Sequence, residues 1–200
     1  MGTFIEYLKA YENSLKINKK GITITLSGLS GSGKTTIAEV LAKNLNLKLI
    51  NSGDIYRSLA EESKVSLEEF SAKHNDEVDY EIDKRSLKFA KEGNVLIVGR
   101  LAGWVAGDNA DLKIFVKCSL KERAKRVALR EEKTFEEAKK DILARDKSDI
   151  NRAKKLYGIN LKDLSIYDLI INNDKLSFEE AKIIPVKKVQ ALLKKKALLI

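Results

Sequence analysis

The sequence predicts an α/β fold in which helices cover both faces of a parallel sheet. Strand-like and helical patterns alternate along the chain, and the run NVLIVG at 94–99 is apolar throughout. Such a run is typical of a central parallel strand that is covered on both faces. A glycine-rich loop at 28–35 joins the first strand to a helix. Because ligands of such folds bind at the carboxyl edge of the sheet, the loop lies where a binding site is expected.

The expected elements follow one another in a regular order. Strands are predicted at 22–27, 48–51, 94–99, 111–117 and 168–172. Helices are predicted from Lys34, from the capping box at Ser66, over 77–92 with Gly93 as its cap, over 119–131, as two patterns between 135 and 157, and after Ser177. Pro185 is expected to kink or interrupt the last helix, because proline lacks a backbone N–H.

The first twenty residues precede the first strand and carry their own helical pattern. Leu8, Tyr11 and Leu15 recur at helical spacing within this segment. The pattern favours a helix that docks on the outside of the domain over one that binds a partner. We therefore expect 1–20 to be a helical extension of a single domain at 21–200.

Composition and charge suit a soluble globular chain. Of its 200 residues, 44% are hydrophobic and 34% are charged, and one cysteine excludes an intramolecular disulfide. No apolar run is long enough to span a bilayer, and the N-terminus lacks a signal-peptide pattern. The net charge of +9 arises largely from C-terminal lysines that suit a solvated helix face. We expect a cytoplasmic monomer with no membrane partner, and nucleic acid is not the expected partner.

The loop GLSGSGKT at 28–35 matches the phosphate-binding pattern G-x-x-x-x-G-K-[ST] between a strand and a helix. Its three glycines allow backbone N–H groups to turn inward around phosphate oxygens, and the helix N-terminus adds a positive dipole end. Lys34 is expected to reach the β- and γ-phosphates, and the Thr35 hydroxyl to ligate Mg²⁺. The residues assigned to nucleotide binding are Gly28, Leu29, Ser30, Gly31, Ser32, Gly33, Lys34, Thr35 and Thr36. A glycine-rich turn with an accidental lysine is the alternative, and the flanking elements argue against it.

Two arginines indicate a phosphorylated acceptor. The chain has no Asn-Lys-x-Asp motif for guanine, and its third strand ends in Gly99-Arg100 where motor ATPases place an acid. Arg57 follows the second strand. Both guanidinium groups are therefore expected at the same sheet edge, where they could hold one phosphate bidentately. Two surface cations are the alternative interpretation.

Two further groups of charged residues share helical faces. Arg126 and Arg130 are four residues apart, and Arg145, Asp149 and Arg152 are separated by four and three. We expect the arginines to neutralise phosphate charge and Asp149 to accept hydrogen bonds from ribose hydroxyls. A surface ion network is the alternative for the second group.

These segments together resemble the archaeal type of the cytidylate kinase family. The resemblance runs from about residue 21 to about 182 and includes NSGDIYR, GRLAGW and the Arg-Asp-x-x-Asp-x-x-Arg stretch at 145–152. It implies that Ser52, Gly53, Arg57, Arg100 and Gly103 line the monophosphate site and that 51–93 form the monophosphate-binding segment. It also implies that Arg126 and Arg130 meet ATP and that 131–153 form a lid. Two features depart from the resemblance: the twenty residues before the first strand have no counterpart in the family, and the segment between the second and third strands is short and helical, unlike the β-rich insert of the bacterial type.

The resemblance implies that the chain phosphorylates CMP, and also dCMP, with ATP and Mg²⁺. The second phosphate pKa of a nucleoside monophosphate is about 6, so no general base is needed. The single histidine, His74, is interpreted as a surface residue, and Trp104 either walls the base pocket or fills the core. Catalysis then depends on charge neutralisation by Lys34 and the arginines. Kinases of AMP, UMP or a non-nucleotide acceptor, and an NTP-dependent nucleic-acid-binding module, are the alternatives.

Overall fold

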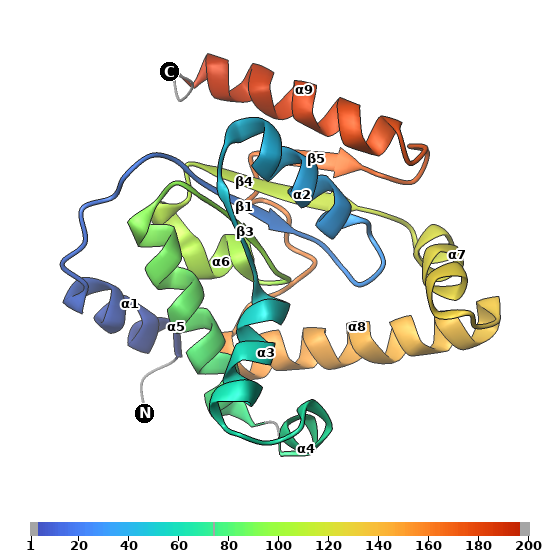
Figure 1. Ribbon diagram of the computed structural model, residues 1–200, viewed down its shortest axis with the longest axis horizontal. Helices are drawn as coiled ribbons and strands as arrows, with labels where there is room; N and C mark the ends of the chain where they lie inside the picture. Colours follow the sequence, from blue (N-terminus) through green and yellow to red (C-terminus); the bar gives the residue numbers. More distant parts are fainter. Residues whose placement is uncertain (1–3, 74, 197–200) are drawn as a thin grey trace.

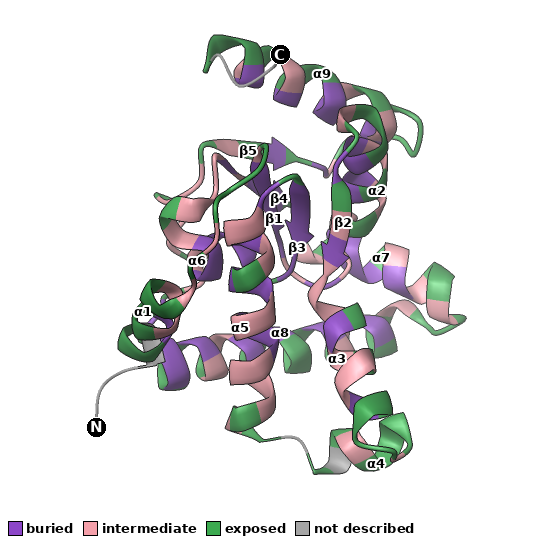
Figure 2. Ribbon diagram, turned by 60° about the vertical axis from the view of Figure 1, so that its left-hand side comes forward, coloured by how far each residue is buried: buried purple, intermediate pink, exposed green. Residues whose placement is uncertain are grey.

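Strand β1 lies at the centre of a five-stranded parallel sheet in the computed structural model, which describes residues 4–73 and 75–196. The strand order is β2-β3-β1-β4-β5. Every residue of β1 and of β3 is buried, because helices cover both faces (Figures 1 and 2). The parallel sandwich predicted from the sequence is therefore confirmed.

The strands agree with the predicted ones to within a residue or so at their ends. They are β1 (Thr23–Ser27), β2 (Lys48–Asn51), β3 (Val95–Val98), β4 (Leu112–Lys117) and β5 (Leu169–Asn172). The helices are α1 (Phe4–Ser14), α2 (Lys34–Leu45), α3 (Ser52–Glu62), α4 (Leu67–Ala72), α5 (Asp76–Glu92), α6 (Ala102–Ala106), α7 (Leu120–Glu131), α8 (Phe135–Tyr157) and α9 (Glu180–Lys195), with a short 3₁₀ turn η1 (Gly107–Asn109).

Side chains of β3 alternate between two hydrophobic clusters. Leu96 and Val98 belong to the cluster that α2 and α9 cover. Val95 and Ile97 belong to the cluster on the opposite face, with α3, α5 and α6. This alternation follows from the two-residue period of a strand. Helices α7 and α8 lie beyond the sheet and cross its carboxyl edge (Figure 1).

Polar caps and glycines set the helix ends where the sequence predicted them. Ser66 caps α4 through a hydrogen bond from the N–H of Glu69, and Thr134 and Glu137 form a capping box at the start of α8. Gly93 ends α5 at φ +80°, and a Cβ at this position would lie 2.5 Å from the carbonyl oxygen of Lys20. Gly93 therefore ends the helix, and its lack of a side chain leaves room for the backbone segment that leads into β1.

One expectation about helices is wrong, and of the two effects expected of Pro185 the interruption does not occur. The two helical patterns predicted between 135 and 157 form one continuous helix, α8. Its buried residues, from Ala138 to Tyr157, are held against several other elements along its whole length, so the polar stretch in the middle does not end it. Pro185 does not interrupt α9, which continues from Glu180 to Lys195. The proline lies near the start of that helix, where it removes one hydrogen bond and its buried ring packs against the core.

Helix α1 packs against α5 and α8 at the side of the domain. Its Leu8 side chain is buried. The division into an extension at 1–20 and a domain at 21–200 remains a prediction. His74, interpreted as a surface residue, lies outside the described residues.

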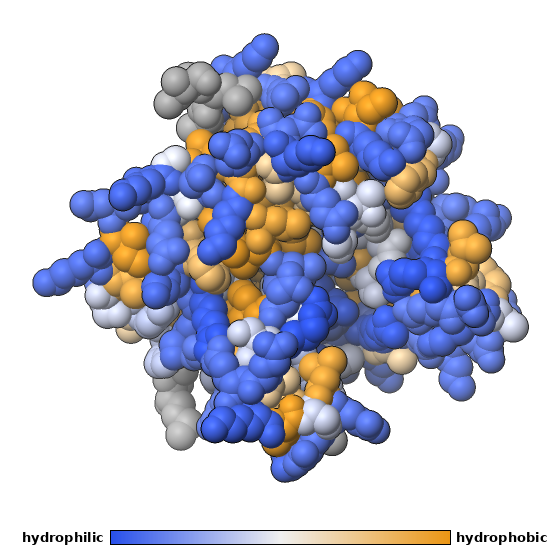
Figure 3. All heavy atoms as spheres, viewed as in Figure 1, coloured by the Kyte–Doolittle hydropathy of each residue, from blue (hydrophilic) through white to orange (hydrophobic). Residues whose placement is uncertain are grey.

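The outer surface is dominated by charged and polar side chains. In Figure 3 most of the visible face is hydrophilic, and hydrophobic side chains show mainly between the helices. Within 4–73 and 75–196, no helix is both long enough and apolar enough to cross a membrane.

Candidate active site

The loop between β1 and α2 has the backbone of a phosphate cradle. Gly31 and Gly33 adopt φ values of +76° and +83°, which favour glycine. A Cβ on Gly33 would lie 2.5 Å from Nδ2 of Asn173, and one on Gly28 would lie 2.8 Å from the carbonyl oxygen of Val116. Both glycines are therefore required by close approach of other chain segments. Successive backbone N–H groups in such a loop form a concavity that binds anions.

Lys34 opens α2, and its Nζ donates to the carbonyl oxygen of Leu29 at 3.3 Å. The pKa of Lys34 is lowered to about 8, mainly by burial and then by the nearby charge of Arg100, while the carboxylate of Asp149 opposes this shift. The ammonium therefore lies in a positive field, and at neutral pH it is still protonated. An anion bound beside it would relieve this repulsion. Thr35, the next residue, is exposed at the first turn.

Arg126 lies against the same loop. Its Nη2 donates to the carbonyl oxygen of Asn173 at 2.6 Å, and its Nη1 donates to that of Ser32 at 3.4 Å. Asn173 follows β5, is buried, and donates from Nδ2 to Ser32 at 2.8 Å. The loop is therefore clamped by side chains from α7 and from the carboxyl end of β5. Arg130, one turn further along α7, is exposed and pairs with Glu131 at 2.6 Å.

A buried ion pair joins the loop to α8. Arg123 on α7 donates to both carboxylate oxygens of Asp146, at 3.2 and 2.8 Å, and to the carbonyl oxygen of Ser30 at 3.1 Å. Only 5% of the Arg123 side chain and 12% of the Asp146 side chain are exposed. The planar guanidinium fork suits this bidentate contact. The pair therefore fixes the position of α8 relative to the phosphate-binding loop.

A cavity of about 590 Å³ opens beside the loop, and we call it the acceptor cavity. It lies between α3 and α4, α5, the end of β3, and the second half of α8. Its lining residues are Ser52, Gly53, Tyr56, Arg57, Leu67, Ser71, Asp79, Ile82, Asp83, Arg100, Leu101, Asp149, Arg152, Ala153, Tyr157 and Leu161. The volume is in the range of small-molecule sites. The structure thus brings together six predicted site residues: Ser52, Gly53, Arg57, Arg100, Asp149 and Arg152.

Carboxylates hold the arginines of the acceptor cavity. Nε of Arg100 lies 2.7 Å from Oδ2 of Asp149, and Nη1 of Arg152 lies 2.9 Å from Oδ1 of Asp79. Arg57, which is more exposed, pairs with Asp54 one turn earlier on α3. Oδ2 of Asp149 is buried and has no hydrogen-bond partner in the described part of the chain apart from this ion-pair contact. Burial raises the pKa of Asp149, although Arg100 and Arg152 act against that shift.

Asp83 and Tyr157 form a second polar pair in the wall of the cavity. The Tyr157 hydroxyl donates to Oδ2 of Asp83 across the space between α8 and α5. Burial raises the pKa of Asp83 to about 7, and the charge of Asp79 adds to the shift. The Tyr157 hydrogen bond and the charge of Arg152 oppose it. This carboxyl group therefore changes its charge near neutral pH.

Two residues predicted for the acceptor site, Gly103 and Arg145, lie outside the acceptor cavity, as does Trp104. Gly103 is buried beneath it, where a Cβ would lie 2.9 Å from the ring of Tyr167, and its N–H donates to Ser27. Arg145 is 44% exposed and lies 3.9 Å from Glu131, the carboxylate that also binds Arg130. Arg145 therefore does not share the environment of Asp149, although the two are one turn apart. Trp104 belongs to the hydrophobic cluster behind the cavity and does not line it.

The sequence patterns did not reveal five residues of this region. They are Arg123, Asp146, Asn173, Asp83 and Tyr157. Arg123 and Asp146 each lie three residues from a predicted arginine or aspartate on the same helix, which is a usable signal. Asn173 follows a predicted strand. No sequence signal points to Asp83 and Tyr157, because their pairing depends on how α5 and α8 pack.

The chain is similar in sequence to a protein family and to several known proteins. Residues 23–175 match the model of the cytidylate kinase-like family. A cytidylate kinase of Pyrococcus horikoshii is 48% identical over 80% of this chain and 84% of its own. One of Methanopyrus kandleri is 44% identical over 80% and 88%, respectively. Among solved structures, shikimate kinase of Bacteroides thetaiotaomicron has a TM-score of 0.60 at 19% identity and covers 86% of this chain and 98% of its own. This last likeness supports the P-loop kinase fold.

The buried ion pair generates a prediction about stability. Asp146→Ala leaves the Arg123 guanidinium buried and unpaired, so the free energy of unfolding should fall by about 3–5 kcal/mol. Urea denaturation at neutral pH measures the loss. The matched control is Asp141→Ala, a change on the same helix that breaks the exposed pair of Asp141 with Lys133 and should change little. The double variant Arg123→Met/Asp146→Leu should recover part of the loss. Equal stability of the Asp146 and Asp141 variants would contradict the assignment.

Proposed function

The chain belongs to the cytidylate kinase-like family and is a nucleoside monophosphate kinase, and we propose that it transfers the γ-phosphoryl group of ATP directly, in line, to CMP and dCMP. The observation that carries the proposal is the position of the acceptor cavity. Arg100 and Asp149 line this cavity, and their charges are near enough to shift the pKa of Lys34 in the phosphate-binding loop. A donor phosphate on the loop would therefore face an acceptor phosphate in the cavity.

The donor side consists of residues 28–36 and α7. Backbone N–H groups of the loop and Lys34 would hold the β- and γ-phosphates. Arg126, already bound to the loop, and Arg130 would approach ATP from α7. The Thr35 hydroxyl would hold Mg²⁺, and the ion would supply positive charge that neutralises the phosphate oxygens. The residues fit this group, because Thr35 is exposed at the loop and Mg²⁺ takes most of its ligands from phosphates and water.

The acceptor phosphate would bind at the start of α3. Ser52 and Gly53 form its first turn, and Arg57 lies one turn later. Arg100 approaches from the end of β3. Both arginines pair with carboxylates of the chain, so a phosphate would take the place of Asp54 or Asp149 as partner. Charge-assisted bidentate contacts of this kind are among the stronger hydrogen bonds.

No general base is required for this transfer. A nucleoside monophosphate has lost most of its second proton at neutral pH, since that pKa is about 6. The chain's contribution is therefore positioning and charge neutralisation by Lys34, Arg126, Arg130, Arg145 and Arg152. Arg130 and Arg145, which both contact Glu131, would reach the phosphates only if the first part of the proposed lid at 131–153 moves toward the loop, because the Arg123–Asp146 pair already holds the middle of α8 beside the loop. Closure over both substrates would also exclude water as a competing acceptor.

The nucleoside would lie along α8. Asp149 and Tyr157 are eight residues apart, which corresponds to about 12 Å along a helix axis. With the phosphate near Arg100, the ribose would lie at Asp149, and the base would lie toward Asp83. Oδ2 of Asp149, whose contact in the described part of the chain is the ion pair with Arg100, would accept hydrogen bonds from ribose hydroxyls once a phosphate takes over Arg100. An ionised Asp83 would accept a hydrogen bond from the cytosine amino group, which uracil replaces with a carbonyl.

The first test is an assay of ADP release with a panel of nucleoside monophosphates. CMP and dCMP should be phosphorylated faster than AMP and UMP. Lys34→Ala should fold normally and lose on the order of a hundredfold or more in turnover, because the transferring group loses its nearest fixed cation. Activity of the variant near that of the wild type would refute the proposed donor site. Preference for AMP or a non-nucleotide acceptor would refute the proposed substrate.

Asp149→Ala tests the ribose contact. A site built to bind a hydroxyl discriminates strongly against an analogue that lacks it, because its polar group is left unpaired. The variant should therefore lose more kcat/KM with CMP than with dCMP and narrow the preference between them. Release of Arg100 from its partner affects both acceptors alike, so the ratio isolates the hydroxyl. Equal losses would leave Asp149 as the ion-pair partner of Arg100 only.

The pKa of about 7 at Asp83 predicts a pH-dependent preference. Below pH 7 the neutral carboxyl can donate to the uracil carbonyl, and above pH 7 the carboxylate accepts from the cytosine amino group. The ratio of kcat/KM for CMP to that for UMP should therefore rise as the pH rises through 7. Ionisation of the acceptor phosphates cancels in the ratio. Asp83→Asn should make the ratio independent of pH, and a flat wild-type profile would argue against base recognition by Asp83.

A further inference from the structure

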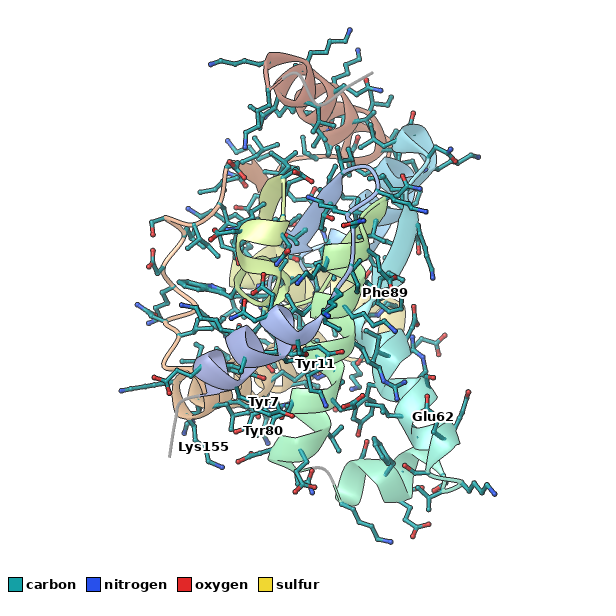
Figure 4. All side chains as sticks on the ribbon, turned by 90° about the vertical axis from the view of Figure 1, so that its left-hand side faces the viewer. Tyr7, Tyr11, Glu62, Tyr80, Phe89 and Lys155 are labelled. Carbon is teal, nitrogen blue, oxygen red and sulfur yellow. The ribbon has the colours of Figure 1, made fainter. Side chains whose placement is uncertain are left out.

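The N-terminal helix α1 lies outside the residues that match the family model, which begin at 23. It nevertheless contacts both α5 and α8, the two helices on opposite sides of the acceptor cavity. Figure 4 shows α1 crossing α5, with Tyr7 and Tyr11 along it and Tyr80 and Lys155 nearby. Helix α1 therefore lies next to two of the helices that line the acceptor cavity, although it precedes the matched residues.

One hydrophobic cluster connects α1 with the wall of that cavity. Leu8 is only 7% exposed and belongs to a cluster with residues of α5, α6 and α8. The other buried members are Leu87, Val105, Ala153, Leu156, Tyr157 and Ile159. Four residues of this cluster, counting those partly buried, also line the acceptor cavity: Leu101, Ala153, Tyr157 and Leu161. Leu8 therefore packs into the back of the wall that a bound nucleoside would touch.

Polar contacts fix α1 in register at several points. The Asn109 amide donates to the Glu12 carboxylate at 2.7 Å, and Lys91 of α5 donates to the Glu12 carbonyl oxygen. The Lys84 ammonium lies over the ring of Tyr11, 5.4 Å from its centroid, and 6.0 Å from that of Tyr7. Cation–π contacts and hydrogen bonds are directional, so they oppose sliding of the helix. α1 is thus held to α5 while its apolar face packs toward α8.

The polar pairs of the cavity depend on the distance between α5 and α8. Arg152 reaches Asp79, and Tyr157 reaches Asp83, across that distance. Hydrogen bonds lose strength within a few tenths of an ångström. A small shift of the second half of α8 would therefore disturb both pairs and the nucleoside-facing wall. It would not disturb the phosphate-binding loop, because the Arg123–Asp146 pair holds α8 to the loop at a separate point.

We propose that α1 is a positioning element of the acceptor site, in which Leu8 holds the second half of α8 at the separation from α5 that a nucleoside monophosphate requires. The inference rests on the proposed function of the acceptor cavity. α1 touches no substrate in this arrangement. Its effect is selective, because α1 influences binding of the acceptor nucleotide and not binding of the donor nucleotide.

The test is Leu8→Ala in the full chain, with steady-state kinetics for both substrates. The KM for CMP should rise about fivefold or more, while kcat and the KM for ATP stay within about twofold. Amide hydrogen exchange should become faster at 150–157 and stay unchanged at 34–45, and saturating CMP should restore protection. Leu8→Met, which keeps the volume, should behave as the wild type. Lys9→Ala, on the exposed side of α1, is the matched control and should change nothing.

A milder variant keeps the test decisive if Leu8→Ala does not fold. Glu12→Ala removes only the carboxylate that Asn109 binds, and it should raise the KM for CMP by a smaller factor in the same direction. Equal changes in both KM values, or a lower melting temperature with unchanged kinetics, would overturn the positioning role. Wild-type protein that does not phosphorylate CMP would instead overturn the proposed function. The wild-type assay therefore separates the two failures.

Discussion

The arrangement of the whole site depends on one buried guanidinium. A buried arginine cannot lose its charge and must have its N–H groups paired. Nη1 and Nη2 of Arg123 meet this requirement with the carboxylate of Asp146 and the carbonyl oxygen of Ser30, whereas Nε is buried without a hydrogen-bond partner among the described residues. These contacts join α7, α8 and the phosphate-binding loop at one point. The position of α8 follows from them, and with it the positions of Asp149, which faces Arg100, and of Tyr157, which faces Asp83.

The acceptor cavity balances its own charges without a ligand. Arg57, Arg100 and Arg152 each pair with a nearby carboxylate. Binding of a phosphate is therefore an exchange of partners, and its net gain is smaller than the attraction between the two charges alone. Such an exchange favours a ligand that satisfies the displaced carboxylate as well. A nucleotide does so, since its ribose hydroxyls can donate where a guanidinium donated before.

Lys34 shows how closely the two halves of the site are coupled. Its pKa, lowered to about 8 by burial and by Arg100, is raised in part by Asp149. The lysine belongs to the donor loop, whereas the other two residues line the acceptor cavity. A change of partners at Arg100 therefore alters the field at the donor lysine. Under the proposed function, the charges of Arg100 and Asp149 would therefore link occupation of the acceptor cavity to anion binding at the loop.

Local patterns in the sequence determined the strands, the loop and most helix ends. Gly33 and Gly93 are required by backbone conformations that a short stretch of sequence reveals, and the apolar run of β3 reflects burial on both faces. Arg57 and Arg100 could be placed at one edge because parallel strands end together. Tertiary packing alone decided the rest. It made α8 continuous through a polar stretch, separated Arg145 from Asp149, and paired Asp83 with Tyr157 across 74 residues of chain. Such contacts depend on distances between whole helices, which are set by the sum of many weak contacts and leave no periodic signal in the sequence.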